Sequence, residues 1–339
     1  MRTRTKAGIV VLAAVLSLLA GAGIGSVSVS PADICRVLAN RLFGSPLPEN
    51  FSSVTPGLVL NIRLPRVTLS FAAGAAAPLG GGGLQSVLKN PLASPYGLGV
   101  SSGAGLGAAL VIVSGLGAGA LGTLALPAVS LAFGLATVGA AIFLSSRLDR
   151  SLSNNTIILT GMVLSLFTNA LMSTVSAANP EYSQRILLWQ LGSFSGRGWE
   201  ASAMVAAVAA VCLVGFLRLS PELDAMTFGE EQARALGVEL RRVKWVLIVL
   251  VAALTGTSVA FAGVIGFVDL IAPHVVRRFF GARHRLVLPM AALLGGAFMT
   301  VCDLAARTLA SPSEIPVGSI TALIGAPFFL YVYFSHRRR

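Results

Sequence analysis

Residues Asn90 to Ser146 read NPLASPYGLGVSSGAGLGAALVIVSGLGAGALGTLALPAVSLAFGLATVGAAIFLSS and contain no Asp, Glu, Lys or Arg. Such a run can cross a hydrocarbon core of about 30 Å twice, because each helical crossing needs about 20 residues. The whole chain has the same character: of 339 residues, 55% are hydrophobic and only 11% are charged, where soluble proteins carry about 25%. The composition therefore predicts an all-α polytopic membrane protein.

Apolar runs separated by polar breaks predict ten transmembrane spans within one domain, residues 1–339. The spans lie near residues 8–25, 67–85, 97–117, 121–144, 156–177, 201–217, 245–263, 264–280, 286–306 and 316–334. Only the break from Gly263 to Asp269 separates the seventh span from the eighth. The basic start (Arg2, Arg4, Lys6) is also typical of a signal peptide. We favour a retained first span, which the family resemblance given below requires.

The distribution of basic residues predicts the orientation. With the N-terminus inside and ten spans, most of the 25 Lys and Arg residues fall on the inner side, as the positive-inside rule requires. Both termini are therefore predicted to be cytoplasmic, in a cytoplasmic (inner) membrane protein. The same asymmetry explains the formal net charge of +12 without any need for nucleic acid as a partner.

No motif for metal, nucleotide or covalent chemistry is recognisable. The three cysteines and three histidines are scattered along the chain: Cys35, Cys212, Cys302, His274, His284 and His336. Their spacing predicts no metal site and favours a large, already chelated cargo. The run Gly80–Gly83 lacks the rest of a phosphate loop, so we expect it to serve helix packing. Gly192–Gly196 lacks the strand context and His partner of a nucleophile elbow.

The segment Met226–Arg242, MTFGEEQARALGVELRR, is polar and lies between two long apolar runs. Its inner part reads as a short amphipathic helix that Gly237 stops. Ala233 and Leu236 are predicted on one side, with the polar members Glu230, Glu231 and Arg234 on the others. This pattern favours a docking surface for a soluble partner, and an ordinary solvated loop is the alternative.

Three arginines are predicted at the outer ends of spans: Arg63, Arg66 and Arg307. The planar guanidinium can receive a carboxylate through two hydrogen bonds. These residues could therefore form cationic sockets for acidic residues of an extracytoplasmic partner. The alternatives are snorkelling at the membrane interface and a simple pair between Asp303 and Arg307, four residues apart on one helix.

The fifth span carries a polar stripe at helical spacing. Its members recur at positions that share one helix face: Ser165, Thr168, Asn169, Met172, Ser173 and Ser176. They could line a path for a hydrophilic cargo, and ordinary hydrogen bonding between helices is the alternative.

Several segments, in this order and spacing, resemble the FecCD-like permeases of ABC importers for ferric siderophores, haem and vitamin B12. The resemblance runs from about Ile34 to Tyr333. Its segments are Arg63–Arg66, Gln85 with Asn90–Ala93, Leu98–Ala104, Trp189–Ser193, Gly229–Val238, Gly266–Val268, Pro273–His274, Arg277, Ile315–Gly318 and Gly325–Phe329. The chain departs from the family pattern at Val264, Asp269 and Pro78. We expect Asp269 near the outer interface or paired, because a carboxylate at mid-bilayer costs about 2.5–3.5 kcal/mol.

The resemblance implies a type II ABC importer permease fold and a transport subunit rather than an enzyme. It implies a partner copy of the chain, two separate ATPase subunits that hold ATP and Mg²⁺, and an extracytoplasmic binding protein. Residues 226–242 would be the ATPase-coupling segment, with Glu230, Glu231, Ala233, Arg234, Leu236 and Gly237 as its contacts. The cytoplasmic gate would include Asn90, Leu92, Asn154 and Asn155.

The same resemblance favours a ferric-siderophore-type chelate as cargo, with haem or cobalamin as alternatives. In the family, the polar fifth span lines the central cavity, and alternating access moves the cargo. Two other classes of function would show different signals. A secondary transporter needs a coupling-ion site, usually built from intramembrane acids, which are almost absent from the predicted spans. A membrane enzyme needs a catalytic constellation.

Overall fold

The computed structural model describes residues 3–25, 27–48, 51–116, 122–149 and 153–337, and all regular structure among them is helical. Four basic residues that enter the orientation argument, Arg2, Arg150, Arg338 and Arg339, lie outside the described residues. The helices, in chain order, are α1 Thr3–Gly23, α2 Pro31–Phe43, α3 Val54–Gly57, η1 Leu58–Arg63, α4 Leu64–Leu88, η2 Pro95–Leu98, α5 Val100–Ser114, η4 Gly122–Leu124, α6 Ala125–Leu148, α7 Asn154–Ala178, η5 Pro180–Tyr182, α8 Ser183–Gln190, α9 Trp199–Arg218, α10 Ser220–Phe228, α11 Glu230–Ala235, α12 Leu240–Ala262, α13 Val268–Phe280, α14 His284–Thr308 and α15 Val317–Arg337.

Seven of the described helical runs are long and apolar enough to cross a membrane: α1, the continuous run Val54–Leu88, α6, α7, α9, α12 and α14. Each overlaps one of the predicted spans. The remaining three predicted spans correspond to α5, α13 and α15.

Helix α13 differs most from its prediction. The predicted span 264–280 becomes a helix of 13 residues, about 20 Å long at 1.5 Å per residue. The chain leaves α12 at Gly263 and enters α13 after Phe267, both with positive φ, 77° and 72°. The unwound residues between them explain why α13 is too short to cross the hydrocarbon core alone.

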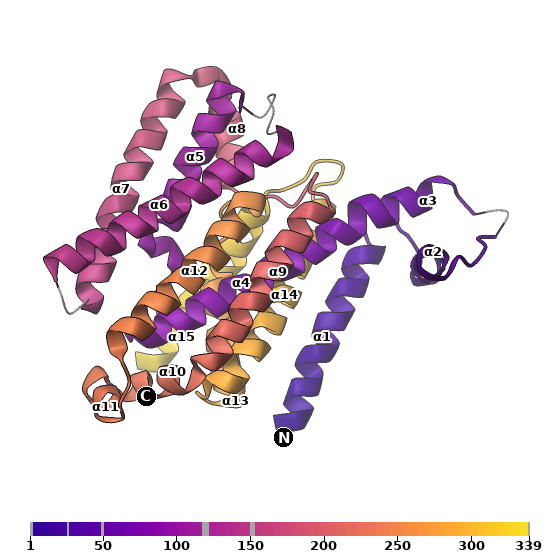
Figure 1. Cartoon of the computed structure of the whole chain (residues 1–339). Coiled ribbons are helices and arrows are strands. Elements are labelled where there is room, and N and C mark those ends of the chain that lie inside the picture. Colours follow the sequence, from indigo (N-terminus) through magenta and orange to yellow (C-terminus); the bar gives the residue numbers. More distant parts are fainter. Residues whose placement is uncertain (1–2, 26, 49–50, 117–121, 150–152, 338–339) are drawn as a thin grey trace.

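Helix α4 is the centre of the structure. It packs against α9, α12, α13 and α14, and Figure 1 shows it crossing behind α9 and α12. In the most apolar part of Val54–Leu88, 78% of the residues are buried, compared with 28% in α1 and in α7. Most side chains of α4 are Ala, Gly, Ser or Val, and such small residues let helix backbones approach closely in a membrane.

The closest approach is the crossing of α4 and α14. A Cβ atom on Gly74 would lie 2.5 Å from the carbonyl oxygen of Gly295, and one on Gly295 would lie 2.3 Å from that of Gly74. Pro78 follows one turn later and has no N–H to give to the carbonyl of Gly74. Its ring fits against Gly295, where a Cβ would be 2.4 Å from the Pro78 Cγ. Pro78 is one of the departures from the family pattern, and its ring thus fills the space left by the missing side chain of Gly295.

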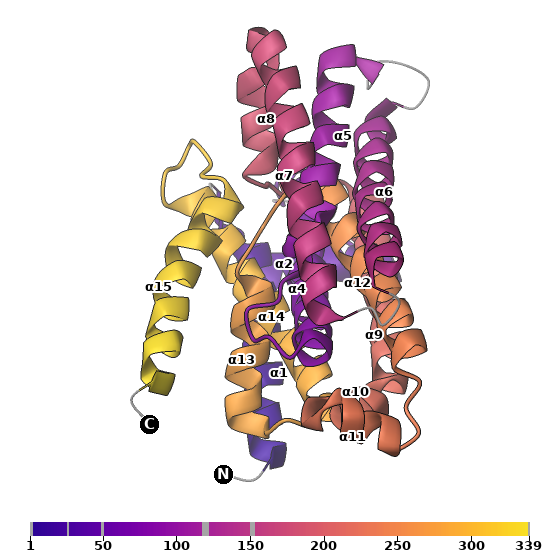
Figure 2. The same ribbon diagram turned by 90° about the vertical axis from the view of Figure 1, so that its left-hand side faces the viewer.

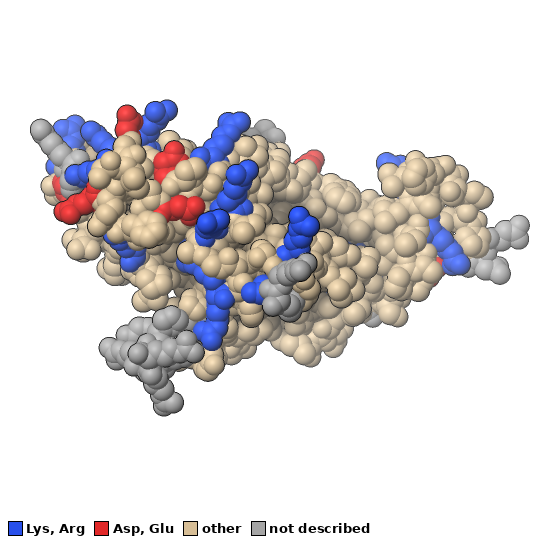
Figure 3. Space-filling model, turned by 90° about the horizontal axis from the view of Figure 1, so that it is seen from below, with Lys and Arg blue, Asp and Glu red and all other residues tan. Residues whose placement is uncertain are grey.

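The other elements form two groups around this centre. Helices α5, α6, α7 and α8 pack on one another as a separate layer (Figures 1 and 2). Helix α1 packs mainly on α14. The start of α1, the end of α15 and the short helices α10 and α11 all lie at one end of the molecule (Figures 1 and 2). Seen from that end, Lys and Arg are spread over the face, and acidic residues gather on the α10–α11 side (Figure 3).

We predict opposite effects for alanine at two glycines that both lie inside helices. Gly295→Ala places a methyl group against the α4 backbone, so α4 and α14 must separate and the melting temperature of the purified protein falls. In Gly139→Ala of α6, the new Cβ would have no atom within 4 Å of it. Alanine is favoured over glycine in helices by up to about 1 kcal/mol, so Gly139→Ala leaves the melting temperature unchanged or raises it. Thermal unfolding in detergent measures both, and equal changes in the two variants would contradict the packing argument.

Candidate functional site

The predicted coupling segment folds as α11 between two glycines. Gly229 has φ 139°, and a Cβ on it would lie 1.9 Å from the side-chain oxygen of Gln232. At the other end, Gly237 has φ 85°, its N–H donates to the carbonyl of Arg234, and the N–H of Val238 donates to that of Ala233. This pair of bonds is a Schellman stop. Both ends of α11 therefore depend on a glycine.

Ala233 of α11 and Leu236, the residue that caps the helix, differ in burial, and the prediction that they form one apolar side is wrong. Ala233 is 0% exposed and packs in the core cluster that contains Leu223, Met226 and Val243, whereas Leu236 is 71% exposed. The N–H of Leu236 still donates to the carbonyl of Gln232, so the core covers Ala233 and ends before Leu236. Ala233 fixes α11 to its own chain, and Leu236 is the apolar side chain that a partner can contact.

An ion pair holds the start of α11 on α12. The Lys244 Nζ lies 2.9 Å from a carboxylate oxygen of Glu230, and the Lys244 side chain is 1% exposed. An open groove then lies beside the segment, between the end of α9, α10 and the start of α12. Its lining includes Arg218, Glu222, Leu236 and Arg242, so charged groups surround the exposed leucine.

The predicted gate residues come from two helix ends that meet. The side-chain amide of Asn154, at the start of α7, donates to the carbonyl of Val87 at the end of α4 (3.2 Å). After α4, the side-chain oxygen of Asn90 accepts from the N–H of Leu92 (2.9 Å), which forms a local turn. Leu92 is 46% exposed, and Asn155 is also exposed. The structure thus brings three predicted gate residues, Asn90, Leu92 and Asn154, to one junction, with Asn155 beside Asn154 in the chain.

This junction touches the coupling segment. A Cβ on Gly229, the residue before α11, would lie 3.3 Å from the Nζ of Lys89, the residue before Asn90. Two regions predicted separately from the sequence are therefore neighbours in the fold.

The polar stripe of α7 divides into a buried edge and an exposed edge. Thr168 and Met172 are each 8% exposed, and the Met172 sulfur accepts a hydrogen bond from the Gln190 side chain (3.4 Å). Ser165 and Ser176 are partly buried, and Ser176 donates to the hydroxyl of Ser183 (3.2 Å). Packing between helices accounts for these members.

Two members of the stripe remain exposed, Asn169 and Ser173. They lie between the buried edge and a face of large exposed side chains that includes Leu166 (71%) and Phe167 (59%). Of the predicted path residues, Asn169 and Ser173 are therefore the ones that could contact a cargo in this arrangement.

The predicted docking arginines are buried, and the expectation that they stand open as sockets is wrong for this structure. Arg66 is 7% exposed. Its Nε and Nη2 both bond Asp303 Oδ1, at 3.0 and 2.8 Å, and its Nη1 bonds Glu314 at 2.6 Å. Arg307 Nε lies 3.7 Å from the other oxygen of Asp303. The carboxylates that these arginines receive come from the chain itself.

The other contacts of these arginines hold the end of α1. Arg63 donates to the carbonyls of Ala22 (3.1 Å) and Gly23 (2.7 Å), and Arg307 Nη2 donates to that of Gly21 (2.6 Å). The last carbonyls of a helix have no partners within it and carry partial negative charge. Two cations therefore complete the C-terminus of α1. A contact between these arginines and a binding protein stays a prediction.

A buried polar network was missed by the sequence analysis. His284 Nδ1 lies 2.6 Å from Asp224 Oδ1, and His284 Nε2 lies 2.6 Å from the Ser86 hydroxyl. Arg277 bonds the side chain of Gln85 at 2.7 Å. The contacts connect α10, next to the coupling helix, with α4, α13 and α14. The only signal for this network in the sequence is that charged and polar residues far apart in the chain can pair with one another.

This network contains the order Ser–His–Asp that nucleophilic catalysis uses. However, Ser86 is 7% exposed and His284 1%, and both lie in helix contacts. A substrate carbonyl cannot approach the serine hydroxyl, so the arrangement serves to position helices.

We predict that Arg66→Ala lowers the melting temperature strongly, because it leaves the buried Asp303 with only its longer contact to Arg307 (3.7 Å). Breaking a buried pair in this way costs about 3–5 kcal/mol of unfolding free energy. Arg36→Ala is the matched control: it removes an arginine from the exposed pair with Asp33, whose side chains are 55% and 32% exposed. Exposed pairs contribute at most about 1 kcal/mol. Similar losses in thermal unfolding of the two variants would show that the Arg66 pair is not what fixes α4 to α14.

Comparison with known proteins supplies the family. The model of the FecCD transport family matches residues 10–335. The uncharacterized ABC transporter permease protein YvrB of Bacillus subtilis is 38% identical over 95% of this chain and 91% of its own length. The Fe(3+)-citrate import system permease protein YfmE of the same organism is 35% identical over 96% of this chain and 93% of its own length.

A solved structure of an ABC transporter in an inward-facing conformation, described as of the metal-chelate type, superposes with a TM-score of 0.84. That protein is 31% identical, and the match covers 98% of this chain and 99% of the other. The all-helical polytopic fold and the role of a transport subunit in a cell membrane, both predicted from the sequence, are thereby confirmed. The chain belongs to the FecCD transport family and is a multi-pass permease subunit of an ABC transporter.

Proposed function

We propose that this permease forms the pathway of an importer for a metal chelate of the ferric-siderophore type. The observation that carries the proposal is the family match over residues 10–335, together with relatives named for Fe(3+)-citrate import. Haem and cobalamin are the alternative cargoes, since relatives from Yersinia pestis and Halobacterium salinarum are named for hemin and cobalamin import.

The exposed edge of α7 supports a chelated cargo. Asn169 and Ser173 offer an amide and a hydroxyl, which form weak, exchangeable hydrogen bonds with a polar ligand shell. These groups bind metal ions far less strongly than thiolate, imidazole or carboxylate groups do. A cargo that keeps its own ligands can pass such a wall without being trapped.

In this proposal the partner subunits bind at the two opposite ends of the molecule. Two ATPase subunits, which hold ATP and Mg²⁺, bind at the end with α10 and α11, and this end and both termini face the cytoplasm. Exposed Leu236 and the charged groove beside it are the docking surface. Two copies of the permease enclose the path, and an extracytoplasmic binding protein docks at the opposite end, near Arg63, Arg66 and Arg307. Glu314, whose side chain is 38% exposed, is the part of the arginine cluster that such a partner can reach.

The contact between Gly229 and Lys89 gives the proposed coupling a direct route. Movement of α11 on the ATPase displaces the turn at Asn90 and Leu92, and this turn meets the start of α7. ATP binding and hydrolysis then favour different gate conformations through differential contacts, as any population shift requires.

We predict ATP-dependent uptake of a ferric siderophore into proteoliposomes that hold the complete transporter and its binding protein. Leu236→Asp places a charge in the ATPase contact, so uptake falls about tenfold or more while ATP hydrolysis continues. Leu42→Asp is the matched control, because Leu42 is equally exposed (71%) on α2. Normal uptake by Leu236→Asp would reject the coupling surface. Uptake of haem, cobalamin or molybdate, for which a Haemophilus influenzae relative is named, in place of the siderophore would reject the proposed cargo.

We also predict the side of α7 that water reaches. In a Cys35→Ser background, which removes the exposed native thiol, cysteine at Asn169 or Ser173 reacts with a water-soluble thiol reagent in at least one nucleotide state. Cysteine at Asn154 or Asn155 changes its reactivity between ATP-bound and nucleotide-free states. Cysteines at Thr168 and Met172, each 8% exposed, are controls that stay slow. If all four test sites remain unreactive, the cargo does not pass along α7.

A further inference from the structure

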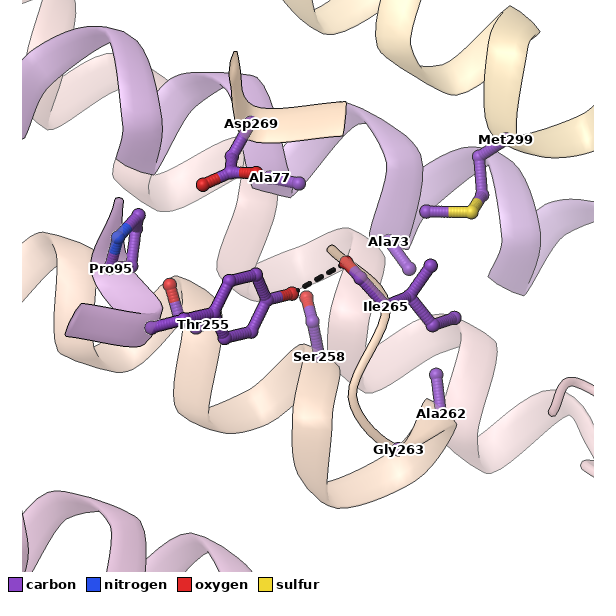
Figure 4. Close-up of a pocket in the computed structure, with 11 residues that line it drawn as sticks. Ala73, Ala77, Pro95, Thr255, Ser258, Ala262, Gly263, Ile265, Asp269 and Met299 are labelled. Carbon is purple, nitrogen blue, oxygen red and sulfur yellow. Dashed lines mark hydrogen bonds between the residues drawn. The ribbon is translucent and has the colours of Figure 1, made fainter. Parts of the chain in front are cut away.

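A small, partly open cavity lies where the chain is unwound between α12 and α13. Its walls come from α4, η2, α12, α14 and the start of α13, and its volume is ≈ 20 Å³, which is enough for one water-sized guest. Figure 4 shows Thr255 and Ser258 on α12 with Asp269 above them. Most of the lining is apolar, but three hydroxyl groups and one carboxylate reach it: Tyr96, Thr255, Ser258 and Asp269.

Two oxygen atoms in this lining are buried without a hydrogen-bond partner among the described residues, Asp269 Oδ1 and Ser258 Oγ. Asp269 is 1% exposed. Its other oxygen accepts a hydrogen bond from the Ser94 hydroxyl (2.5 Å), and the Tyr96 hydroxyl donates to the carbonyl of Ile265 (2.7 Å). A buried carboxylate with one satisfied and one unsatisfied oxygen is costly unless something else contacts it.

No Lys, Arg or His side chain of the described residues forms an ion pair with Asp269. The basic residue two turns further along α13, Arg277, is bonded instead to Gln85 and to the carbonyl of Gly82. Among the described residues, the side-chain partner of Asp269 is therefore the Ser94 hydroxyl and not a cation. The negative charge of Asp269 needs a small positive partner from outside the chain.

The broken helix pair favours such a partner. The C-terminal end of α12 directs carbonyl oxygens and partial negative charge toward the break. One of these carbonyls, that of Ala262, is used by the N–H of Ser193 (2.8 Å). Unwound residues between half-helices supply the oxygen ligands of Na⁺ in several transporter folds.

Size and charge select the ligand. The cavity excludes polyatomic anions and organic molecules, and oxygen-only ligands favour hard metal cations. A single carboxylate balances one positive charge, whereas Ca²⁺ takes six to eight oxygen ligands and commonly several carboxylates. We propose that this cavity binds one monovalent metal cation of the size of Na⁺, with Asp269, Ser258 and Thr255 as its side-chain ligands.

Such a cation joins the two helices on either side of the unwound segment. Thr255 and Ser258 belong to α12, and Asp269 lies at the start of α13. An ion between them fixes the two helices relative to each other, next to the Ser94 and Tyr96 contacts that hold the chain after the predicted gate. The proposal does not depend on which cargo the importer moves.

The test is the thermal stability of the full-length permease in chloride salts of Na⁺, K⁺ and choline at equal ionic strength and constant pH. The wild type should melt about 2–5 °C higher in Na⁺ than in choline, and the difference should saturate with Na⁺ concentration. Asp269→Asn should abolish the difference. Ser258→Ala, a milder change, should shift the saturating Na⁺ concentration upward about tenfold. Binding of radioactive Na⁺ should follow the same order of variants.

The matched control is Ser130→Ala, which removes another buried, unpartnered hydroxyl from α6, outside the cavity lining. It should keep the full Na⁺ response. Equal melting in Na⁺ and choline for the wild type would overturn the proposal, as would an undiminished response in Asp269→Asn and Ser258→Ala. Stabilisation by lower pH without any response to Na⁺ would also overturn it, because Asp269 would then carry a proton instead.

Discussion

The structure depends on how closely other helices can approach the backbone of α4. Inside a membrane, helices gain little from hiding apolar side chains, because lipid is equally apolar, so van der Waals contact between backbones carries much of the association. Gly74, Gly81 and Gly83 each stand where a Cβ would lie within 2.6 Å of an atom of α9, α13 or α14. With three neighbours this close, α4 can be a core without large side chains, and its surroundings can move only as whole helices.

Charged residues then fix the relative positions that close packing leaves open. Three ion pairs or polar clusters with a buried member join different helices: Arg66 with Asp303, Lys244 with Glu230, and His284 with Asp224. The first and third join helices that are distant in sequence, and the second joins the consecutive helices α11 and α12. A buried pair is weak as a source of net stability, but its loss is costly and it specifies which surfaces meet. The pair of Arg66 with Asp303 lies near the C-terminal end of α1, and the other two pairs lie beside the coupling helix α11. The elements that must exchange force with partner subunits are therefore also those with the most specific internal contacts.

The sequence predicted the all-helical membrane fold and the family because long uncharged runs and ordered motifs are properties of the chain itself. It did not predict the shortness of α13, since two residues with positive φ at Gly263 and Phe267 end an apolar run that is otherwise long enough. It assigned Ala233 and Leu236 to one face because helical spacing does not show which part of a face the rest of the chain covers. Burial of Arg63, Arg66 and Arg307 was missed for a related reason. The pair of Asp303 with Arg307 could be read from their spacing on one helix, but only the tertiary structure brings the carbonyls of α1 to Arg63 and Arg307 and the acids Asp303 and Glu314 to Arg66.

The contact between Arg307 and the carbonyl of Gly21 joins residues 286 positions apart. Because a chain is synthesised from its N-terminus, α1 enters the bilayer long before Arg307, one of the two arginines that hold its end, exists. Arg63 can reach the carbonyls of Ala22 and Gly23 early in synthesis, but the contacts of α1 with α14 cannot yet form. Final docking of α1 has to wait for α14, so the earliest segment to be made is among the last to be locked in place. Assembly of this fold is thus completed only when a helix near the C-terminus packs against the first helix.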